Sequence, residues 1–346
     1  MAIHILVCVG WIGPIVGGDY ASSQVAAAAV DVFIILSGFA ITRLLIVTRE
    51  SGGRYIWRRI CRIFPAYWAA LLAGIALNAW VADNLRQLPQ SPVIDIYLGV
   101  CEMGGARLWT DGIIHFFLLQ GLVPTAWLPA EAVTLLGVAW SLSLEWQFYL
   151  VAPFALRFAL RSKIGFALLC LAAILGALYS GKLTGAVSVA FLPARSSYFL
   201  FGGISFVAAT VPVAKRWFIL LSAAIILTIS WAIGSGHYLE TIAAPSAWLI
   251  VMAATLSSLP TIVRSFLNSV QVQFLGRVSY STYLFHGPVI AVVQHAVWHW
   301  VNPGNQSKLL VLTIIGAVPL ITLVSYLSWR FIEHPGQKFG HLRQNG

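Results

Sequence analysis

The sequence predicts an all-α membrane protein, a polytopic bundle of about ten transmembrane helices. Hydrophobic residues make up 59% of the 346 residues and charged residues only 9%, whereas a soluble domain carries about 25% charged residues. Apolar runs recur along the whole chain, and the basic residues lie in the short loops between them. This is the membrane-orientation pattern, so the formal charge of +10 does not indicate a nucleic-acid partner.

Ten apolar runs reach roughly the 20-residue length of a transmembrane helix. They are 1–17, 26–46, 63–82, 137–156, 164–180, 195–211, 217–234, 240–259, 279–300 and 309–331. Residues 112–130 are also apolar, but Gly121, Pro124 and Pro129 interrupt them. We therefore expect 112–130 to be a re-entrant or interfacial segment.

The basic residues orient these spans. If the chain starts inside and 112–130 does not cross, sixteen of the 21 Lys and Arg residues fall in inside loops. The outside then keeps Arg86, Arg107, Lys182, Arg195 and Lys308. We expect a multi-pass protein of the bacterial inner membrane with both termini in the cytoplasm.

The chain shows no low-complexity segment and no internal repeat. We expect one transmembrane domain over 1–346, without an appended soluble domain. The first span begins at Met1 with no basic flank, so we expect the start of the first helix to be missing. The one long extracytoplasmic stretch, 83–111, is polar and acidic. The cysteines lack CxxC spacing, so no metal site is expected.

Polar side chains in the second and third spans are candidates for chemistry. "VDVFIILSGFAITRLL" places Asp31 near the outer end of its helix and Ser37 in the middle, where small residues also serve helix packing. "RYIWRRICRIFPAYW" places Arg58, Arg59 and Arg62 before the third span, with Arg58 and Arg62 on one helical face. These arginines suit phosphate groups, although contact with lipid headgroups is the alternative.

Two later stretches carry buried ionisable residues. "WSLSLEWQFYL" puts Glu145 about 12 Å into its span, on the helical face of Ser141. An acid inside a membrane is a functional candidate by default, and a structural carboxylate is the alternative. "GRVSYSTYLFHGPVI" puts His286 about 10 Å into the ninth span, where a packing role is equally plausible. His4 in "MAIHILVCVGW" has the same ambiguity.

Together these strings resemble the acyltransferase-3 family of bacterial membrane acyltransferases. The quoted stretches match its G-V-D-x-F-F-V-L-S-G-F-x-I-T, R-x-x-R-I-x-P-x-Y and W-S-L-x-x-E-x-Q-F-Y-L-x-x-P signatures. "RSSYFLFGG", "LGRVSYSTYLFHGPV" and "SYLSWRFIEHP" resemble later segments, in the same order. The resemblance covers essentially the whole chain. One departure is the absence of an arginine about ten residues before the first-span histidine.

The resemblance implies an O-acyltransferase that moves an acyl group from cytoplasmic acyl-CoA to a hydroxyl of an extracytoplasmic or membrane-linked glycan. Acetyl is the default acyl group and succinyl the alternative. His4 matches the family's catalytic histidine, and Arg59 and Arg62 match the pair thought to hold CoA. Glu145 matches the motif acid, which we expect to orient His4.

The remaining candidates have supporting roles. Ser37, Ser141 and Tyr149 are candidate hydrogen-bond donors to a developing oxyanion. The expected partners are acyl-CoA, the bilayer and a glycan or lipid-linked saccharide, with no permanently bound cofactor. The acceptor stays open between exopolysaccharide, lipopolysaccharide O-antigen, a lipo-oligosaccharide signal and a small molecule.

Two other functional classes stay open at this point. Ten spans with buried Glu and His also suit a proton-coupled secondary transporter, although no inverted repeat or paired broken helices are present. A non-catalytic membrane scaffold is the third interpretation.

Overall fold

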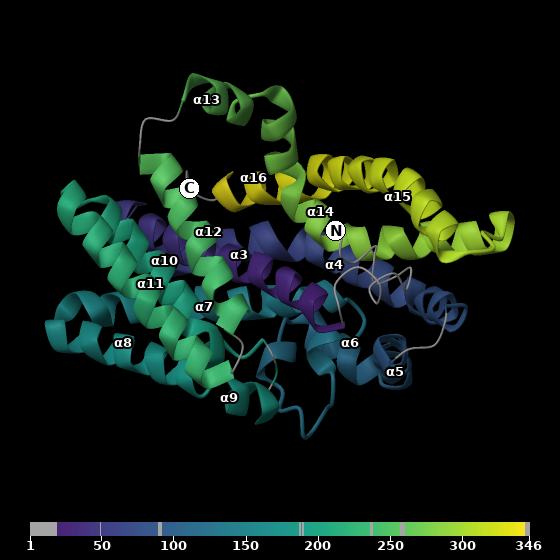
Figure 1. Ribbon diagram of the computed structural model, residues 1–346, viewed down its shortest axis with the longest axis horizontal. Coiled ribbons are helices and arrows are strands. Elements are labelled where there is room, and N and C mark those ends of the chain that lie inside the picture. Colours follow the sequence, from purple (N-terminus) through teal and green to yellow (C-terminus); the bar gives the residue numbers. More distant parts are fainter. Residues whose placement is uncertain are drawn as a thin grey trace.

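The computed structural model describes residues 19–342 except for 49, 89–91, 187, 189, 236–237 and 257–259. Within these residues the chain forms helices and no β-strand, which confirms the all-α prediction. Figure 1 shows a bundle of long helices with shorter elements at its edges.

The α-helices are α3 (Asp19–Thr48), α4 (Gly52–Arg86), α5 (Pro92–Ala106), α6 (Leu108–Phe116), α7 (Trp140–Arg161), α8 (Lys163–Leu178), α9 (Ser180–Ala186), α10 (Leu192–Ala209), α11 (Val213–Ser235), α12 (Tyr238–Leu256), α13 (Thr261–Leu267), α14 (Val270–Ala296), α15 (Gln306–Ser328) and α16 (His334–Leu342). Short 3₁₀ helices follow α6: η1 (Gln120–Leu122), η2 (Glu131–Val133) and η3 (Gly137–Ala139). Two π-helices, η4 (Val297–Val301) and η5 (Trp329–Glu333), continue α14 and α15.

Four helical stretches of the described residues are long and apolar enough to cross a membrane, or five if the bent pair α12–α13 counts as one span. This is fewer than the predicted ten. The predicted spans within the described residues all coincide with helices, but α7, α10 and α14 carry Ser, Tyr, Gln, His or charged residues that lower their hydropathy. The apolar helix α8 has only 16 residues. The predicted first span lies outside the described residues.

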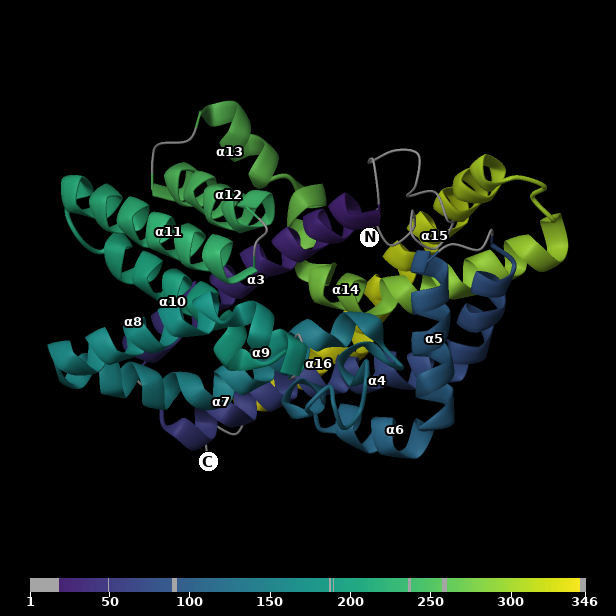
Figure 2. The ribbon, with the colours of Figure 1, turned by 60° about the horizontal axis from the view of Figure 1, so that its bottom comes forward.

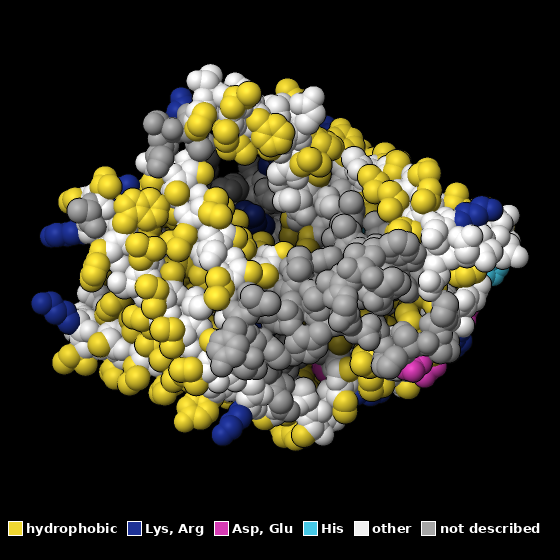
Figure 3. Space-filling view, viewed as in Figure 1, with side chains coloured by type: hydrophobic (Ala, Val, Ile, Leu, Met, Phe, Trp, Pro, Cys, Tyr) yellow, Lys and Arg dark blue, Asp and Glu magenta, His cyan; other side chains and the backbone are white. Residues whose placement is uncertain are grey.

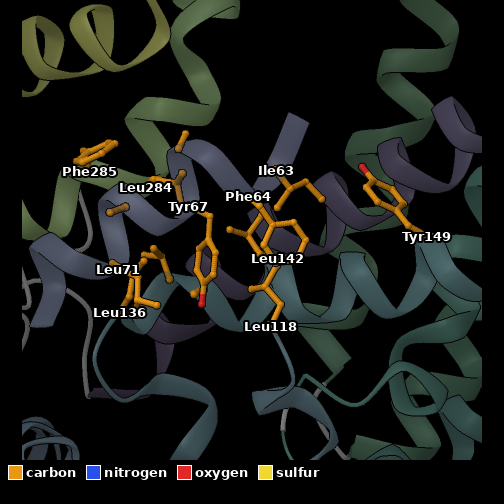
Figure 4. Packing of buried hydrophobic residues seen from close by; sticks show 14 of the residues in the cluster. Ile63, Phe64, Tyr67, Leu71, Leu118, Leu136, Leu142, Tyr149, Leu284 and Phe285 are labelled. Atoms are coloured by element: carbon orange, nitrogen blue, oxygen red, sulfur yellow. The ribbon is translucent and has the colours of Figure 1, made fainter. Parts of the chain in front are cut away.

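The helices form two groups around a shared centre. On one side α8, α10, α11 and α12 pack with α3, and on the other side α14, α15 and α16 pack with α4 (Figure 1). The central core is built from α3, α4, α7 and α14. Figure 4 shows Ile63, Phe64 and Tyr67 of α4 packed against Leu142 of α7 and Leu118.

Glycines bring α3 and α10 into very close contact. A Cβ atom added to Gly38 would lie 2.1 Å from the carbonyl oxygen of Phe199, and one added to Gly202 would lie 2.0 Å from that of Ile35. Only residues without a side chain permit this approach, so the small residues in the middle of this span serve helix packing at Gly38.

The segment after α5 is docked against the bundle and does not cross it. Figure 2 shows α5 and α6 beside α4. The Trp68 indole donates to the carbonyl of Phe116 at 3.0 Å, and Ser143 donates to the carbonyl of Leu118 at 2.7 Å. Irregular backbone at membrane depth requires such donors from the protein itself. The short helices of this segment agree with the expected re-entrant or interfacial character of 112–130.

Apolar side chains cover much of the outside of the bundle (Figure 3). Phe154 of α7, Phe218 of α11 and Ile315 of α15 are 70%, 72% and 65% exposed. Such a surface suits lipid chains rather than water.

Candidate functional site

Glu145 accepts two hydroxyl hydrogen bonds on a single oxygen. The Ser37 hydroxyl of α3 donates to Glu145 Oε1 at 2.8 Å, and the Tyr149 hydroxyl donates to the same atom. Tyr149 follows Glu145 by four residues, so the two side chains share one face of α7. Glu145 is 6% exposed, and both hydrogen bonds that it accepts from described residues end on Oε1. The carboxylate is thus held at one oxygen and open at the other.

Arg59 lies against Tyr149, the tyrosine that donates to Glu145, and also against Tyr55. Its guanidinium carbon is 5.5 Å from the ring centroid of Tyr149 and 5.9 Å from that of Tyr55, within the range of cation–π contacts. Arg59 is only 9% exposed. The structure therefore joins Ser37, Glu145, Tyr149 and Arg59 into one polar group, which we call the inner site.

The three candidate arginines have different surroundings. Arg58 donates to the carboxylate of Glu50 in a partly buried ion pair. Arg62 is exposed. Their separation follows from the helix, which turns about 100° per residue and cannot point three nearby side chains in one direction. Arg59 contacts the ring of Tyr149, and Arg62, although exposed, is close enough to act electrostatically on Tyr149 as well.

Ser141 and His286 make contacts of their own. The Ser141 hydroxyl is 2.6 Å from the hydroxyl of Tyr283, which donates to the carbonyl of Val138 at 2.6 Å. His286 is 3% exposed, with Nδ1 lying 2.8 Å from the carbonyl of Tyr283. Ser141 and His286 thus lie next to Tyr283, and among the described residues neither forms a hydrogen bond with Glu145.

Asp31 is part of a buried ion pair with Arg195 of α10. The guanidinium of Arg195 also lies 5.6 Å from the ring of Trp140 and 5.1 Å from that of Trp231. The pair and its ring contacts join α3, α7, α10 and α11. A substrate-binding or supporting role for Asp31 stays a prediction.

His4 lies outside the described residues, so its predicted catalytic role is not placed by the structure. In the part of the chain that the structure describes, no three His, Cys, Asp or Glu side chains are arranged to hold a metal ion.

Comparison with known proteins identifies the family. A family model described as "Acyltransferase domain", that of the acyltransferase-3 family, matches residues 1–330. The chain belongs to the acyltransferase-3 family. The resemblance read from the sequence motifs is therefore confirmed.

Relatives of this acyltransferase-3 chain include a Staphylococcus aureus (strain COL) protein named "Putative O-acetyltransferase", 27% identical over 90% of this chain and 52% of that protein. The "Putative membrane-bound transacylase BcsY" of Komagataeibacter xylinus is 24% identical over 89% of this chain and 75% of its own length. The O-acetyltransferase OatA of Staphylococcus aureus is 23% identical over 90% of this chain and 52% of that protein.

The chain spans about half the length of the staphylococcal relatives that it matches. No solved structure matches the chain.

A second buried polar group lies in the segment after α5. We call it the outer cluster, and it consists of Arg107, Asp111, His115 and Glu131. Arg107 Nη2 is 3.3 Å from Asp111 Oδ2 and 4.0 Å from Glu131 Oε2, and His115 Nε2 is 3.7 Å from Glu131 Oε1. His115 is also 2.9 Å from the backbone oxygen of Glu131 and 3.3 Å from the Thr134 hydroxyl. Asp111 belongs to the stretch 83–111 that the sequence marks as polar and acidic, but its side chain is fully buried.

Burial shifts two pKa values in the outer cluster. The pKa of Glu131 is raised to about 8, first because burial disfavours the charged carboxylate and then because Asp111 lies beside it. Burial lowers the pKa of His115 to about 4. At neutral pH the cluster therefore holds a neutral histidine and a protonated Glu131 next to Arg107 and Asp111.

Three polar positions escaped the sequence analysis. Glu333, at the end of η5, is 4% exposed and accepts hydrogen bonds from Ser281 at 2.9 Å and Gln337 at 3.0 Å. The acid of "RFIEHP" was the available signal for Glu333. Tyr55 stands one turn before Arg59, a spacing visible in "RYIWRR". Glu131 lies in an apolar stretch, as Glu145 does, and the same argument applied to it.

Proposed function

We propose that this protein is an O-acyltransferase that moves an acyl group, by default acetyl, from cytoplasmic acyl-CoA to a hydroxyl of an extracytoplasmic or membrane-linked glycan. Membership of the acyltransferase-3 family supports the reaction class. The observation that carries the proposal is the held carboxylate of Glu145, with one oxygen fixed by Ser37 and Tyr149 and the other oxygen open.

The donor is proposed to bind at the basic end of α4. Arg62 is exposed there and Arg59 is partly reachable, and guanidinium groups bind phosphates through paired N–H donors. Figure 3 shows a hollow between α12, α13 and α14 with Lys or Arg side chains visible on its floor. A cationic recess of this kind suits the phosphates of CoA, while the narrow pantetheine arm reaches inward.

The transfer requires a base for the acceptor hydroxyl. We propose that His4 removes the hydroxyl proton, or accepts the acyl group transiently, as the family resemblance implies. The open oxygen of Glu145 would orient the imidazole and stabilise its charged form. The thioester bond breaks, an ester bond to the glycan oxygen forms, and the proton passes to the CoA thiolate.

The proposed topology has ten spans, with both termini on the cytoplasmic side of the bacterial inner membrane. Two observations support it. The predicted spans from 26–46 onward each coincide with a helix. The ion pair between Asp31 and Arg195 joins two positions that this topology places at the outer face.

Mass spectrometry of surface glycans from cells that express the protein tests the proposal. We expect the wild type to add an acyl mass, and Glu145→Gln and Arg62→Ala to abolish the addition while still inserting into the membrane. Arg161→Ala is the matched control, because Arg161 is also an exposed arginine at a helix end but lies outside the inner site. Unchanged acylation in Glu145→Gln would overturn the proposal, and so would a transport activity that follows a proton gradient without any acyl transfer.

A further inference from the structure

The hydroxyl of Tyr55 is a buried polar group without a protein partner. Tyr55 is fully buried in the first turns of α4, and its hydroxyl oxygen makes no hydrogen bond with any described residue. Leaving such a donor unsatisfied costs about 1–3 kcal/mol. The Tyr55 hydroxyl is therefore able to donate a hydrogen bond to a ligand that supplies an acceptor atom.

Arg59, one helical turn after Tyr55, also has a buried polar atom without a hydrogen-bond partner among the described residues. This atom is Nε, and no carboxylate of a described residue lies within ion-pair distance of the guanidinium, since its contacts are the two tyrosine rings. A buried guanidinium without a direct ion pair is costly, so an anion is the expected complement. Because Tyr55 and Arg59 are four residues apart on α4, both can face one ligand.

The neighbouring arginines do not share this property. Arg58 already pairs with Glu50, and Arg62 is exposed to solvent. Tyr55, Arg59 and Arg62 follow one another along α4, so an anion that contacts exposed Arg62 finds Arg59 and Tyr55 within the next two turns of the helix. These two positions hold a cation without a direct ion pair and a hydroxyl without a hydrogen-bond partner among the described residues.

We infer that Tyr55 and Arg59 together bind one phosphate group of the acyl-CoA donor. The phenol O–H and the guanidinium N–H groups would both donate to phosphate oxygens, which are strong acceptors. The inference rests on the proposed function, and it assigns to Tyr55 a ligand contact that the sequence motifs did not indicate.

Tyr67 provides a matched control on the same helix. Tyr67 is also fully buried, but its hydroxyl donates to the carbonyl of His115 at 2.6 Å. Removing the Tyr67 hydroxyl breaks a protein hydrogen bond, whereas removing the Tyr55 hydroxyl breaks none. A structural role and a ligand-binding role therefore predict opposite patterns for the two phenylalanine variants.

The test is titration of the detergent-solubilised protein with CoA, alongside its thermal unfolding midpoint. For Tyr55→Phe we expect an unchanged or raised midpoint and CoA binding weakened about 10-fold, the loss of a hydrogen bond to a charged group. For Tyr67→Phe we expect a lower midpoint and unchanged CoA affinity. Pantetheine, which lacks phosphate, should bind the wild type and Tyr55→Phe equally.

Other outcomes separate the two proposals. If Tyr55→Phe binds CoA as tightly as the wild type does, a water molecule satisfies the hydroxyl and the inference fails, while the proposed function stands. If Tyr55→Phe weakens CoA and pantetheine alike, the phosphate contact is refuted. If the wild type itself does not bind CoA, the proposed function fails and the inference fails with it.

Discussion

Two buried glutamates of this protein, Glu145 in the inner site and Glu131 in the outer cluster, show how the same side chain is used in two ways. Both are nearly inaccessible, at 6% and 2% exposure. Glu145 receives two hydroxyl donors on one oxygen. The carboxylate of Glu131 receives no hydrogen bond from a described donor and has Arg107 only at 4.0 Å.

The difference lies in the donors that the fold supplies. Hydroxyl groups solvate the carboxylate of Glu145 in place of water and leave one oxygen for another partner. Glu131 lies beside a second acid, Asp111, so its carboxyl group keeps its proton more readily. The arrangement at Glu145 suits an acid that acts in a reaction. The arrangement at Glu131 suits an acid that holds the segment after α5 against the bundle.

Replacing each glutamate by glutamine in turn should give the largest difference between the two sites. Glu145→Gln should lower the acylation rate about 1,000-fold, within the range for a lost acid–base or orienting group. Glu131→Gln should keep the acylation rate, because a glutamine replaces a protonated carboxyl at little cost. Acyl transfer to glycan in membranes measures both variants. Equal losses would show that the two glutamates belong to one catalytic unit.

Removal of the cation in the outer cluster should mainly affect stability. Arg107→Met leaves Asp111 buried without its ion pair, and we expect unfolding to become easier by about 2 kcal/mol. Arg86→Met removes ion pairs whose partners are more than half exposed, and should cost less than about 1 kcal/mol. Thermal or denaturant unfolding in detergent gives both values. A larger loss for Arg86→Met would contradict the assignment of the outer cluster.

The outer cluster should also respond to pH. Folding raises the pKa of Glu131 from 4.5 to about 8, so the stability of the segment falls as the pH rises through this range. Folding lowers the pKa of His115 from 6.5 to about 4, so its contribution is lost as the pH falls below 6.5. Between about 6.5 and about 8, only the Glu131 effect remains.

Hydrogen exchange of the backbone amides in 107–134, measured at a pH of about 6.5 and at a pH of about 8, tests this pH dependence. Protection should decrease toward the higher pH in the wild type, after correction for intrinsic exchange. Glu131→Gln carries no titrating proton and should show no decrease. The same decrease in both proteins would mean that another group titrates.

The smallest expected effect concerns one donor of the inner site. Ser37→Ala removes one of the two hydrogen bonds to Glu145, which corresponds to about 1 kcal/mol or about fivefold in rate. Tyr149 keeps the other bond. Acyl transfer assays decide the outcome, and a loss as large as that of Glu145→Gln would show that Ser37 contacts substrate directly.

Local spacing accounts for the features that the sequence predicted well. The positions of the described spans followed from apolar runs, and the contact between Glu145 and Tyr149 follows from four-residue spacing on a helix. The family also followed from short motifs in order. These features depend on neighbours within one element.

Contacts between distant elements were beyond the sequence pattern. Ser37 and Glu145 are 108 residues apart, and only the packing of α3 on α7 brings them together. Asp111 was expected at the end of a polar, acidic extracytoplasmic stretch, whereas the fold buries it near Arg107 and Glu131. The different surroundings of Arg58 and Arg59 depend on Glu50 and Tyr149, whose positions no single-helix argument supplies.

The glycine contact between α3 and α10 has a mechanical consequence. With backbone atoms touching at Gly38 and Gly202, neither helix can slide or rotate past the other without a clash. We therefore expect α3 and α10 to move together as one unit, with Ser37 next to Gly38 in this contact. Movement within the bundle is then expected to occur between other helices, while the hydroxyl of Ser37 keeps its position relative to α10.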